Sequence, residues 1–136
     1  LDGHKFKAYL PGGASGGILP SAKGNVPLDF GGELTKYGCF VGSHAIVILS
    51  DKDNLADVAL NLISFFKHES CGQCTPCRNG TEKIINIIKN NSKWDKDLLS
   101  DISEVMANAS ICGLGQAASN PILSVLKFFP KDVGIK

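Results

Sequence analysis

Four cysteines in a three-plus-one arrangement constrain this sequence more than any other feature. Three follow one another as C-x2-C-x2-C and the fourth lies far along the chain; they are Cys71, Cys74, Cys77 and Cys112. Two-residue spacers curl the chain so that successive thiolates point into one hollow, where each can bind a different iron of a cubane. The pattern therefore predicts one iron–sulfur cluster, with [4Fe–4S] as the type that best suits it and Cys112 as the fourth ligand.

A zinc site made of the same four cysteines is the alternative that the spacing leaves open. Zinc also takes four thiolates, usually from two C-x2–4-C pairs rather than from a three-plus-one division. The total of five cysteines is odd, three of them are crowded together, and no secretory signal is visible. These observations favour metal or cluster ligation in a reducing compartment over a disulfide framework. The fifth, Cys39, is expected to be a small buried residue.

The composition excludes several functional classes. The chain is 43% hydrophobic and 20% charged, which is typical of a folded protein. Its net charge of +1 gives no support to nucleic-acid binding. The longest apolar runs, such as Ala45–Leu49, fall far below the roughly 20 residues that span a bilayer, so direct membrane insertion is not expected.

The character of the sequence changes near residues 51–54. Before this point, glycines and prolines surround two candidate strands, Lys5–Leu10 and the apolar run Ala45–Ser50, which is expected to be buried. The glycine-rich segment 12–17 lacks the Lys-Ser/Thr of a phosphate-binding loop and is interpreted as a turn. We therefore expect a small β-rich domain over residues 1–52 and a helical domain over 53–136, an α+β arrangement.

Four amphipathic helices are predicted in the second part, and they form a compact bundle. They cover residues 55–68, 76–91, 95–109 and 121–129. Asp53 is the expected N-cap of the first. The second and third, at about 1.5 Å per residue, are roughly 24 Å and 22 Å long. An antiparallel pair of such nearly equal length returns Cys112 to the point where the second helix begins.

The surroundings of the cysteines suit an anionic cluster. Cys77 lies in the first turn of its helix, where free N–H groups and the positive end of the helix dipole favour anions. Arg78 is the only arginine, and its forked donors are expected to serve cluster sulfurs or a neighbouring acid. Gly72 and Gly113 allow backbone N–H groups to approach sulfur closely. His68 is expected at the surface or in a supporting role behind the ligands.

The two cysteine segments closely resemble the C-terminal part of a family of NADH-binding flavoprotein subunits. The resemblance rests on Glu69–Thr81 (ESCGQCTPCRNGT) and Ser110–Gly115 (SICGLG). The family includes the flavoprotein subunit of respiratory complex I, the diaphorase subunits of NAD-linked hydrogenases and the beta subunits of NAD-dependent formate dehydrogenases. The earlier segment with Leu10-Pro11-Gly12-Gly13 is similar to the family's β-grasp (ubiquitin-like) domain, so the resemblance covers the whole chain.

The resemblance implies a β-grasp domain followed by a four-helix bundle that holds one [4Fe–4S] cluster. In such subunits NADH reduces FMN, and the flavin passes single electrons to this cluster and onward. The family's FMN and NADH sites lie in an upstream domain that nothing here matches. The chain, which begins without methionine, is therefore expected to be part of a longer subunit of an NADH-linked oxidoreductase. Its partners would include a ferredoxin-like iron–sulfur subunit, in the cytoplasm or at the cytoplasmic or matrix face of a membrane complex.

Overall fold

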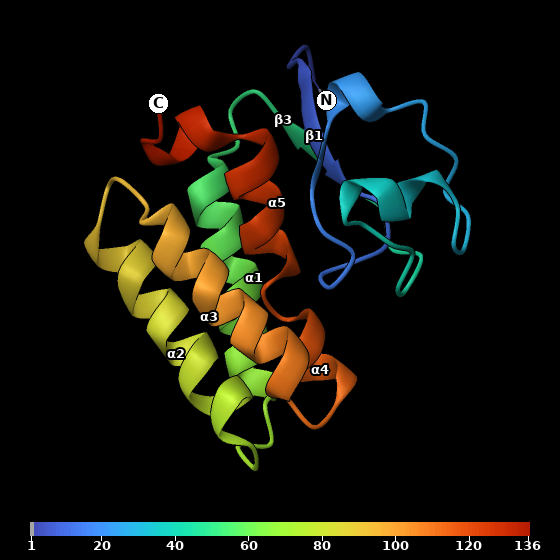
Figure 1. Ribbon diagram of the computed structural model, residues 1–136. Helices are drawn as coiled ribbons and strands as arrows, with labels where there is room; N and C mark the ends of the chain where they lie inside the picture. Colours follow the sequence, from blue (N-terminus) through green and yellow to red (C-terminus); the bar gives the residue numbers. More distant parts are fainter. Residues whose placement is uncertain (1) are drawn as a thin grey trace.

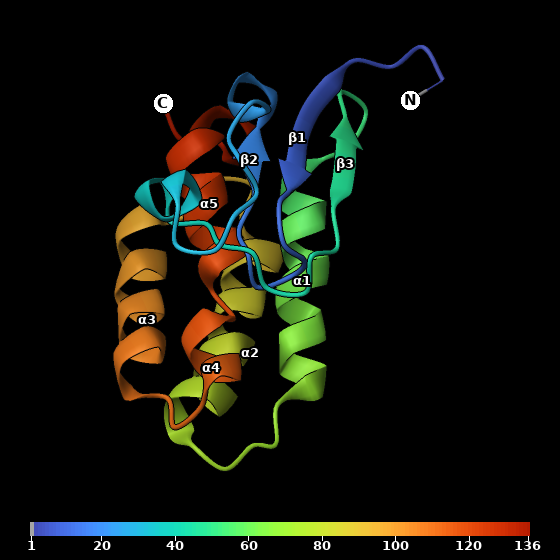
Figure 2. The ribbon, with the colours of Figure 1, turned by 90° about the vertical axis from the view of Figure 1, so that its right-hand side faces the viewer.

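A small antiparallel sheet packs against a set of helices in the computed structural model (Figure 1; Figure 2). The structure describes residues 2–136, so Leu1, the first residue of the expected 1–52 domain, lies outside the described residues. Among the described residues, no helix is long and apolar enough to cross a membrane.

The sheet has three strands in the order β2-β1-β3. Their bounds are Phe6–Leu10 for β1, Leu19–Pro20 for β2 and Val47–Ser50 for β3. Tyr9 of β1 lies opposite Leu19 on one side and Ile48 on the other. Both predicted strands are present, in slightly shorter form. The expectation that the run from residue 45 to 50 is buried is wrong, because β3 is an edge strand that leaves Val47 and Ile48 exposed and buries Leu49.

The four predicted helices are confirmed, and a fifth, α4, was not expected. The α-helices are α1 Leu55–Glu69, α2 Thr75–Asn90, α3 Lys96–Ala109, α4 Gly113–Ala117 and α5 Asn120–Phe128. Short 3-10 helices cover Ser21–Lys23, Glu33–Tyr37 and Pro130–Val133. The glycine-rich segment 12–17 forms turns and bends, as predicted, and leads into β2.

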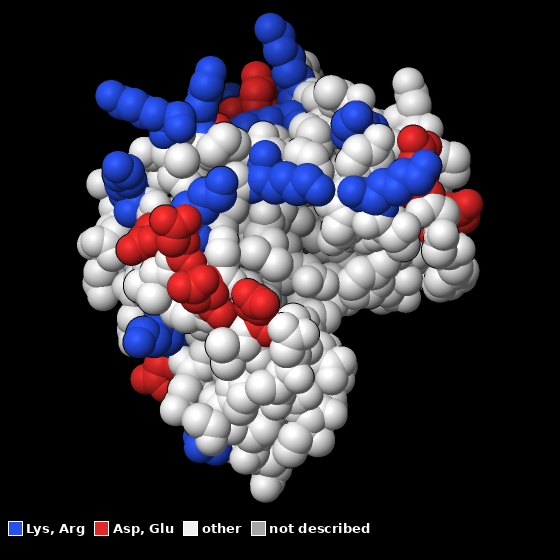
Figure 3. Space-filling model, viewed as in Figure 1, with Lys and Arg blue, Asp and Glu red and all other residues white. Residues whose placement is uncertain are grey.

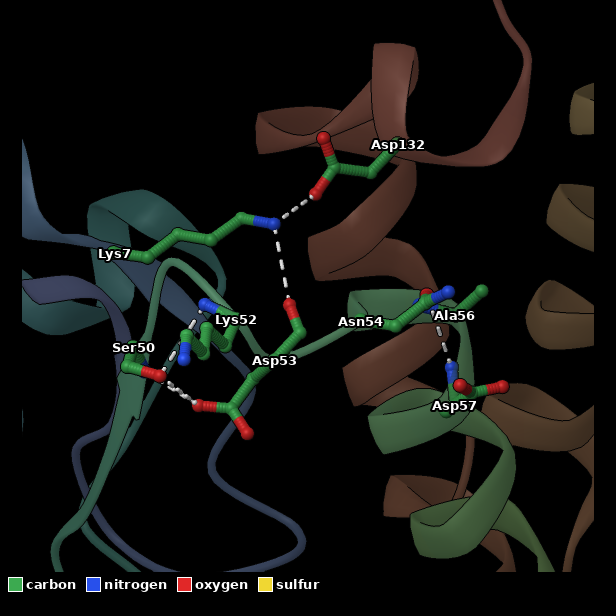
Figure 4. A network of polar contacts seen from close by, with 8 residues as sticks. All are labelled: Lys7, Ser50, Lys52, Asp53, Asn54, Ala56, Asp57 and Asp132. Carbon is green, nitrogen blue, oxygen red and sulfur yellow. Dashed lines mark hydrogen bonds and ion pairs between the residues drawn. The ribbon is translucent and has the colours of Figure 1, made fainter. Parts of the chain in front are cut away.

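The N-cap of α1 is Asn54, so the prediction of Asp53 is wrong by one residue. Asn54 Oδ1 accepts the backbone N–H of Ala56 at 2.9 Å. The Asp53 carboxylate instead accepts the Ser50 backbone N–H at 2.6 Å and the Ser50 hydroxyl at 2.9 Å (Figure 4). These bonds, the backbone one first, hold the pKa of Asp53 below its usual value.

The same network ties the sheet to the helices. Lys7 of β1 reaches Asp132 Oδ2 at 2.6 Å and the backbone oxygen of Asp53 at 3.3 Å (Figure 4). One ammonium group therefore links β1, the start of α1 and the 3-10 helix at Pro130–Val133. Because an ammonium group has three N–H donors, it can donate to both acceptors at once.

One hydrophobic core contains residues from both the sheet and the helices. Its fully buried members include Ala8, Ile18, Ile63, Ile84, Leu99, Met106 and Ile122. The Met106 side chain of α3 packs directly on the backbone of α2 at Gly80, where an added Cβ would lie 2.5 Å from Met106 Sδ. This packing fixes α2 and α3 as neighbours and thereby fixes where the chain emerges after α3.

Candidate functional site

Three of the four predicted ligands lie in the loop that enters α2. Cys71 is exposed, Cys74 is half-buried and forms the N-cap of α2, and Cys77 is buried in the first turn at 4% exposure. Pro76 occupies the start of the helix, as the sequence predicts. Gly72 has a φ of 73°, a left-handed conformation that side chains disfavour, and it allows the chain to turn between the first two cysteines.

The second cysteine segment reaches the same end of the helices because α3 runs back alongside α2. In both ribbon views the loop before α2 and the loop before α4 meet at the end of the molecule farthest from the sheet (Figure 1; Figure 2). Cys112 is exposed there and forms the N-cap of α4. Its location agrees with the expectation from helix lengths.

The two segments touch at Cys74. Hydrogen bonding from the backbone N–H of Ile111, and next from that of Cys77, holds the pKa of the Cys74 thiol below its usual value. The residue adjacent to Cys112 therefore directs its N–H toward a sulfur of the first segment, although Ile111 and Cys74 are distant in the sequence.

Gly115 makes the second contact between the segments. An added Cβ at this glycine would lie 2.6 Å from Ser110 Oγ and 2.8 Å from Cys77 Cβ. The backbone of α4 thus lies directly against the first turn of α2, and only a residue without a side chain fits there. At Gly113, by contrast, an added Cβ would meet no protein atom within 4 Å; the close approach of the Gly72 and Gly113 N–H groups to cluster sulfur stays a prediction.

Two serine hydroxyls accompany the cysteines, and neither was predicted to have a role. Ser70 Oγ lies 3.2 Å from Cys77 Sγ and accepts the Gly72 N–H at 3.2 Å. Ser110 is 6% exposed, and its hydroxyl has no hydrogen-bond partner of standard geometry. It nevertheless lies near enough to Cys74 to contribute, after the backbone groups, to the lowered pKa of that thiol. We interpret it as a hydroxyl beside the sulfur rather than as a formed hydrogen bond.

Arg78 braces the loop that enters α2. Its guanidinium donates to the carbonyl oxygens of Gly72 and Gln73 and to the Thr75 hydroxyl. No ion pair between Arg78 and an acid is present among the described residues, so these bonds hold the shape of the loop; a contact between Arg78 and cluster sulfurs stays a prediction. Thr81 supports the other side, because its hydroxyl bonds the Cys77 carbonyl at 2.9 Å.

The remaining polar candidates lie where the sequence predicts them. Cys39 is buried at 1% exposure in a second hydrophobic cluster with Tyr9 and Leu19, and burial raises the pKa of its thiol. The His68 side chain is 86% exposed and contacts Glu69.

The donors at this end fit an iron–sulfur cluster. They are thiols, backbone N–H groups at the start of α2 and hydroxyls, which suit an anionic group with several sulfurs. In residues 2–136 as they stand, no group of three or more His, Cys, Asp or Glu side chains is arranged to hold a metal ion. A cubane spreads its cysteines over four irons, so they stand farther apart than ligands of one ion. The face in Figure 3 has few charged side chains at this end.

The sequence of residues 57–135 matches the family described as NADH-ubiquinone oxidoreductase-F iron-sulfur binding region. The HndC subunit of an NADP-reducing hydrogenase in Solidesulfovibrio fructosivorans is 35% identical over 96% of this chain, which covers 28% of that protein. The F subunit of the NADH-quinone oxidoreductase in Mycobacterium bovis is 37% identical over 93% of this chain and 29% of its own length. The chain therefore spans less than a third of the curated relatives that it matches.

A solved structure shares the fold. The crystal structure of an NAD+-reducing [NiFe]-hydrogenase in the H2-reduced state superposes with a TM-score of 0.82 and 27% sequence identity. The match covers 96% of this chain and 23% of the matched hydrogenase chain. It extends over both the sheet and the helices, so the relative with this fold contains both parts of the molecule.

Proposed function

The chain belongs to the NADH-ubiquinone oxidoreductase-F iron–sulfur binding family, and from that premise we propose that it holds one [4Fe–4S] cluster and relays electrons in an NADH-linked oxidoreductase. The proposed ligands are Cys71, Cys74, Cys77 and Cys112. The observation that carries this proposal is the contact between the two cysteine segments. Gly115, which follows the fourth cysteine in α4, packs against the first turn of α2, where an added Cβ would lie 2.8 Å from Cys77 Cβ.

The chain's own residues prepare the site for negative charge. Backbone N–H groups of Ile111 and Cys77 face the Cys74 sulfur, so part of the thiolate charge is balanced before any iron is present. The Ser70 hydroxyl lies 3.2 Å from Cys77 Sγ, where it can donate a hydrogen bond to that sulfur and balance part of its thiolate charge. When bound, a [4Fe–4S] cluster supplies a centre that takes up and releases one electron at a time. Arg78 and Thr81 hold the loop and the helix start in shape, so the ligands need little rearrangement.

The remaining parts of the proposal concern the longer subunit. We infer that an upstream domain of that subunit binds FMN and NADH, and that FMN, reduced by NADH, is the electron donor to the cluster. The electrons then leave to a ferredoxin-like iron–sulfur partner subunit. We also propose that residues 1–52 form part of a β-grasp domain and that 53–136 form the cluster domain, in a complex located in the cytoplasm or at the cytoplasmic or matrix face of a membrane.

Zinc bound by the same four cysteines, in an interaction domain without redox activity, is the second candidate. Its basis is the donor set itself, because four thiolates also satisfy structural zinc. Metal identity separates the two candidates directly.

Reconstitution with iron and sulfide under anaerobic conditions tests the proposal. The expected product contains four irons and four sulfides per chain, has a visible absorption band that bleaches with dithionite, and gives an electron paramagnetic resonance signal when reduced. A colourless product that retains one zinc per chain and rejects iron would overturn the cluster in favour of the second candidate.

A pair of matched variants tests the fourth ligand. Cys112→Ala is expected to lose most of the bound iron, because one iron then lacks its protein thiolate. Cys39→Ala is the control, since Cys39 is buried in a separate hydrophobic cluster beside Tyr9. This variant should keep its full iron content. Full cluster loading in Cys112→Ala would show that another residue is the fourth ligand.

A further inference from the structure

The Ser110 hydroxyl is the one polar group of its residue that the fold leaves without a partner. The Ser110 N–H donates to the Met106 carbonyl at 3.2 Å, and the Ser110 carbonyl accepts the Gln116 side-chain amide at 3.1 Å. The hydroxyl oxygen is inaccessible to solvent and has no hydrogen-bond partner of standard geometry. A buried polar group in this condition is unusual and requires a physical explanation.

The position of the hydroxyl indicates which group would satisfy it. Ser110 Oγ and Cys77 Cβ both lie within 2.8 Å of the point that a Cβ on Gly115 would occupy, so the hydroxyl is enclosed by α4 and the first turn of α2. Cys74, the N-cap of α2, is the thiol that it influences. A thiolate can only accept a hydrogen bond, whereas a thiol competes as a donor. In the loaded site the Cys74 sulfur would be a thiolate ligand that can only accept a hydrogen bond, so the buried Ser110 hydroxyl would gain an acceptor there.

Ser70 also places a hydroxyl beside a cysteine sulfur, and here the contact is present in the structure. Its oxygen accepts the Gly72 N–H at 3.2 Å, which leaves the hydroxyl hydrogen free to point at Cys77 Sγ, also at 3.2 Å. Two cysteines of one loop thus each have a serine hydroxyl at hand. One hydroxyl comes from the residue before the loop, and the other comes from the end of α3, far along the chain.

We propose that Ser110 is a positioning and tuning residue that donates a hydrogen bond to the Cys74 sulfur of the loaded site and raises the reduction potential of the cluster. This inference rests on the proposed [4Fe–4S] site. Reduction adds one negative charge to the cluster and its thiolates, so a donor to sulfur stabilises the reduced state more than the oxidised state. Removing the donor lowers the potential.

The test compares midpoint potentials of the cluster-loaded chain in the wild type and in Ser110→Ala. The expected loss is roughly a tenfold change in the oxidation–reduction equilibrium, which is a shift of about 59 mV to lower potential for a one-electron couple. Ser110→Thr keeps a hydroxyl and should stay near the wild-type potential. Ser103→Ala is the matched control, because that buried serine is on the same helix and its hydroxyl is occupied by the Leu99 carbonyl at 2.7 Å; its potential should not move.

A second readout detects the hydrogen bond directly and does not depend on the potential. The iron–thiolate stretching bands of the loaded chain, measured by resonance Raman spectroscopy in H2O and in D2O, should shift on exchange of the hydroxyl hydrogen. That shift should shrink in Ser110→Ala and persist in Ser103→Ala. The midpoint potential can still be measured in a variant that binds less iron, because this potential does not depend on the fraction of chains that are loaded.

The outcomes distinguish the Ser110 proposal from the cluster proposal. An unchanged potential together with an unchanged isotope shift in Ser110→Ala overturns the role of Ser110 and leaves the cluster proposal intact. Equal shifts in Ser110→Ala and Ser103→Ala also overturn it, because they point to a general effect of loosened packing. A wild-type chain that takes up zinc and no cluster overturns both proposals.

Discussion

Replacing Gly115 by alanine puts a methyl group into space that two other segments already fill. The new Cβ would lie 2.6 Å from Ser110 Oγ, 2.7 Å from Ser110 Cβ and 2.8 Å from Cys77 Cβ. Comfortable contacts between carbon atoms are about 3.5–4.0 Å, so these contacts are roughly 1 Å too short. The Cβ atoms are fixed to backbone, so α4 must move away from α2. Overpacking of this kind costs about 1–3 kcal/mol, and the better helix propensity of alanine returns at most about 1 kcal/mol.

Gly113→Ala is the matched control for this prediction. It lies on the same short helix, and an added Cβ there meets nothing within 4 Å. Its stability should equal or slightly exceed that of the wild type. Urea unfolding of the cluster-free chain is expected to separate the two variants by about 2 kcal/mol. Iron analysis after reconstitution should show lower loading in Gly115→Ala than in the wild type. Equal stability of the two variants, with wild-type loading in Gly115→Ala, would refute the close approach of α4 and α2.

Two further predictions concern the core and the link between sheet and helices. Met106→Ala removes a fully buried side chain at the α2–α3 contact and should cost about 2–5 kcal/mol in urea unfolding, whereas a loss below about 1 kcal/mol would contradict the packing. Asp53 has a lowered pKa because Ser50 donates to its carboxylate, so its contribution to stability is present above the unfolded pKa of about 3.9 and is lost as pH falls through the lower folded value. In Asp53→Asn the thermal midpoint should therefore fall less steeply as the pH is lowered below about 4. The same fall in the variant as in the wild type would count against the Ser50 bonds.

The helical half of the fold could be predicted from the sequence because its apolar spacing is regular. The stripe of α1 with Leu55, Ile63 and Phe66 is buried as expected. The helix lengths also correctly returned the chain after α3 to the start of α2, where Gly115 meets Cys77. The error at the N-cap of α1 has a local cause. Asp53 and Asn54 are both good cap residues, and the local bonds from Ser50 to the Asp53 carboxylate decide between them.

Other features depended on contacts that no local pattern encodes. Helix α4 was missed because glycines at 113 and 115 are poor helix formers, so its signal is weak. The exposure of Ile48 follows from its strand having one neighbour, which periodicity alone does not reveal. Ser110 was overlooked since its interest arises from burial without a partner. Its place two residues before a predicted ligand was the available signal.

The three-plus-one division also sets an order of events during biogenesis. Cys77 and Cys112 are 35 positions apart, whereas Cys74 and Cys77 are 3 positions apart. In an unfolded chain the longer closure costs about 2 kcal/mol more. Formation of the α2–α3 pair removes that difference before any iron arrives. If the four cysteines are the ligands as proposed, a newly made chain should offer three thiolates early and the fourth only after the helix pair has formed. Iron bound by all four would then oppose separation of the two helices.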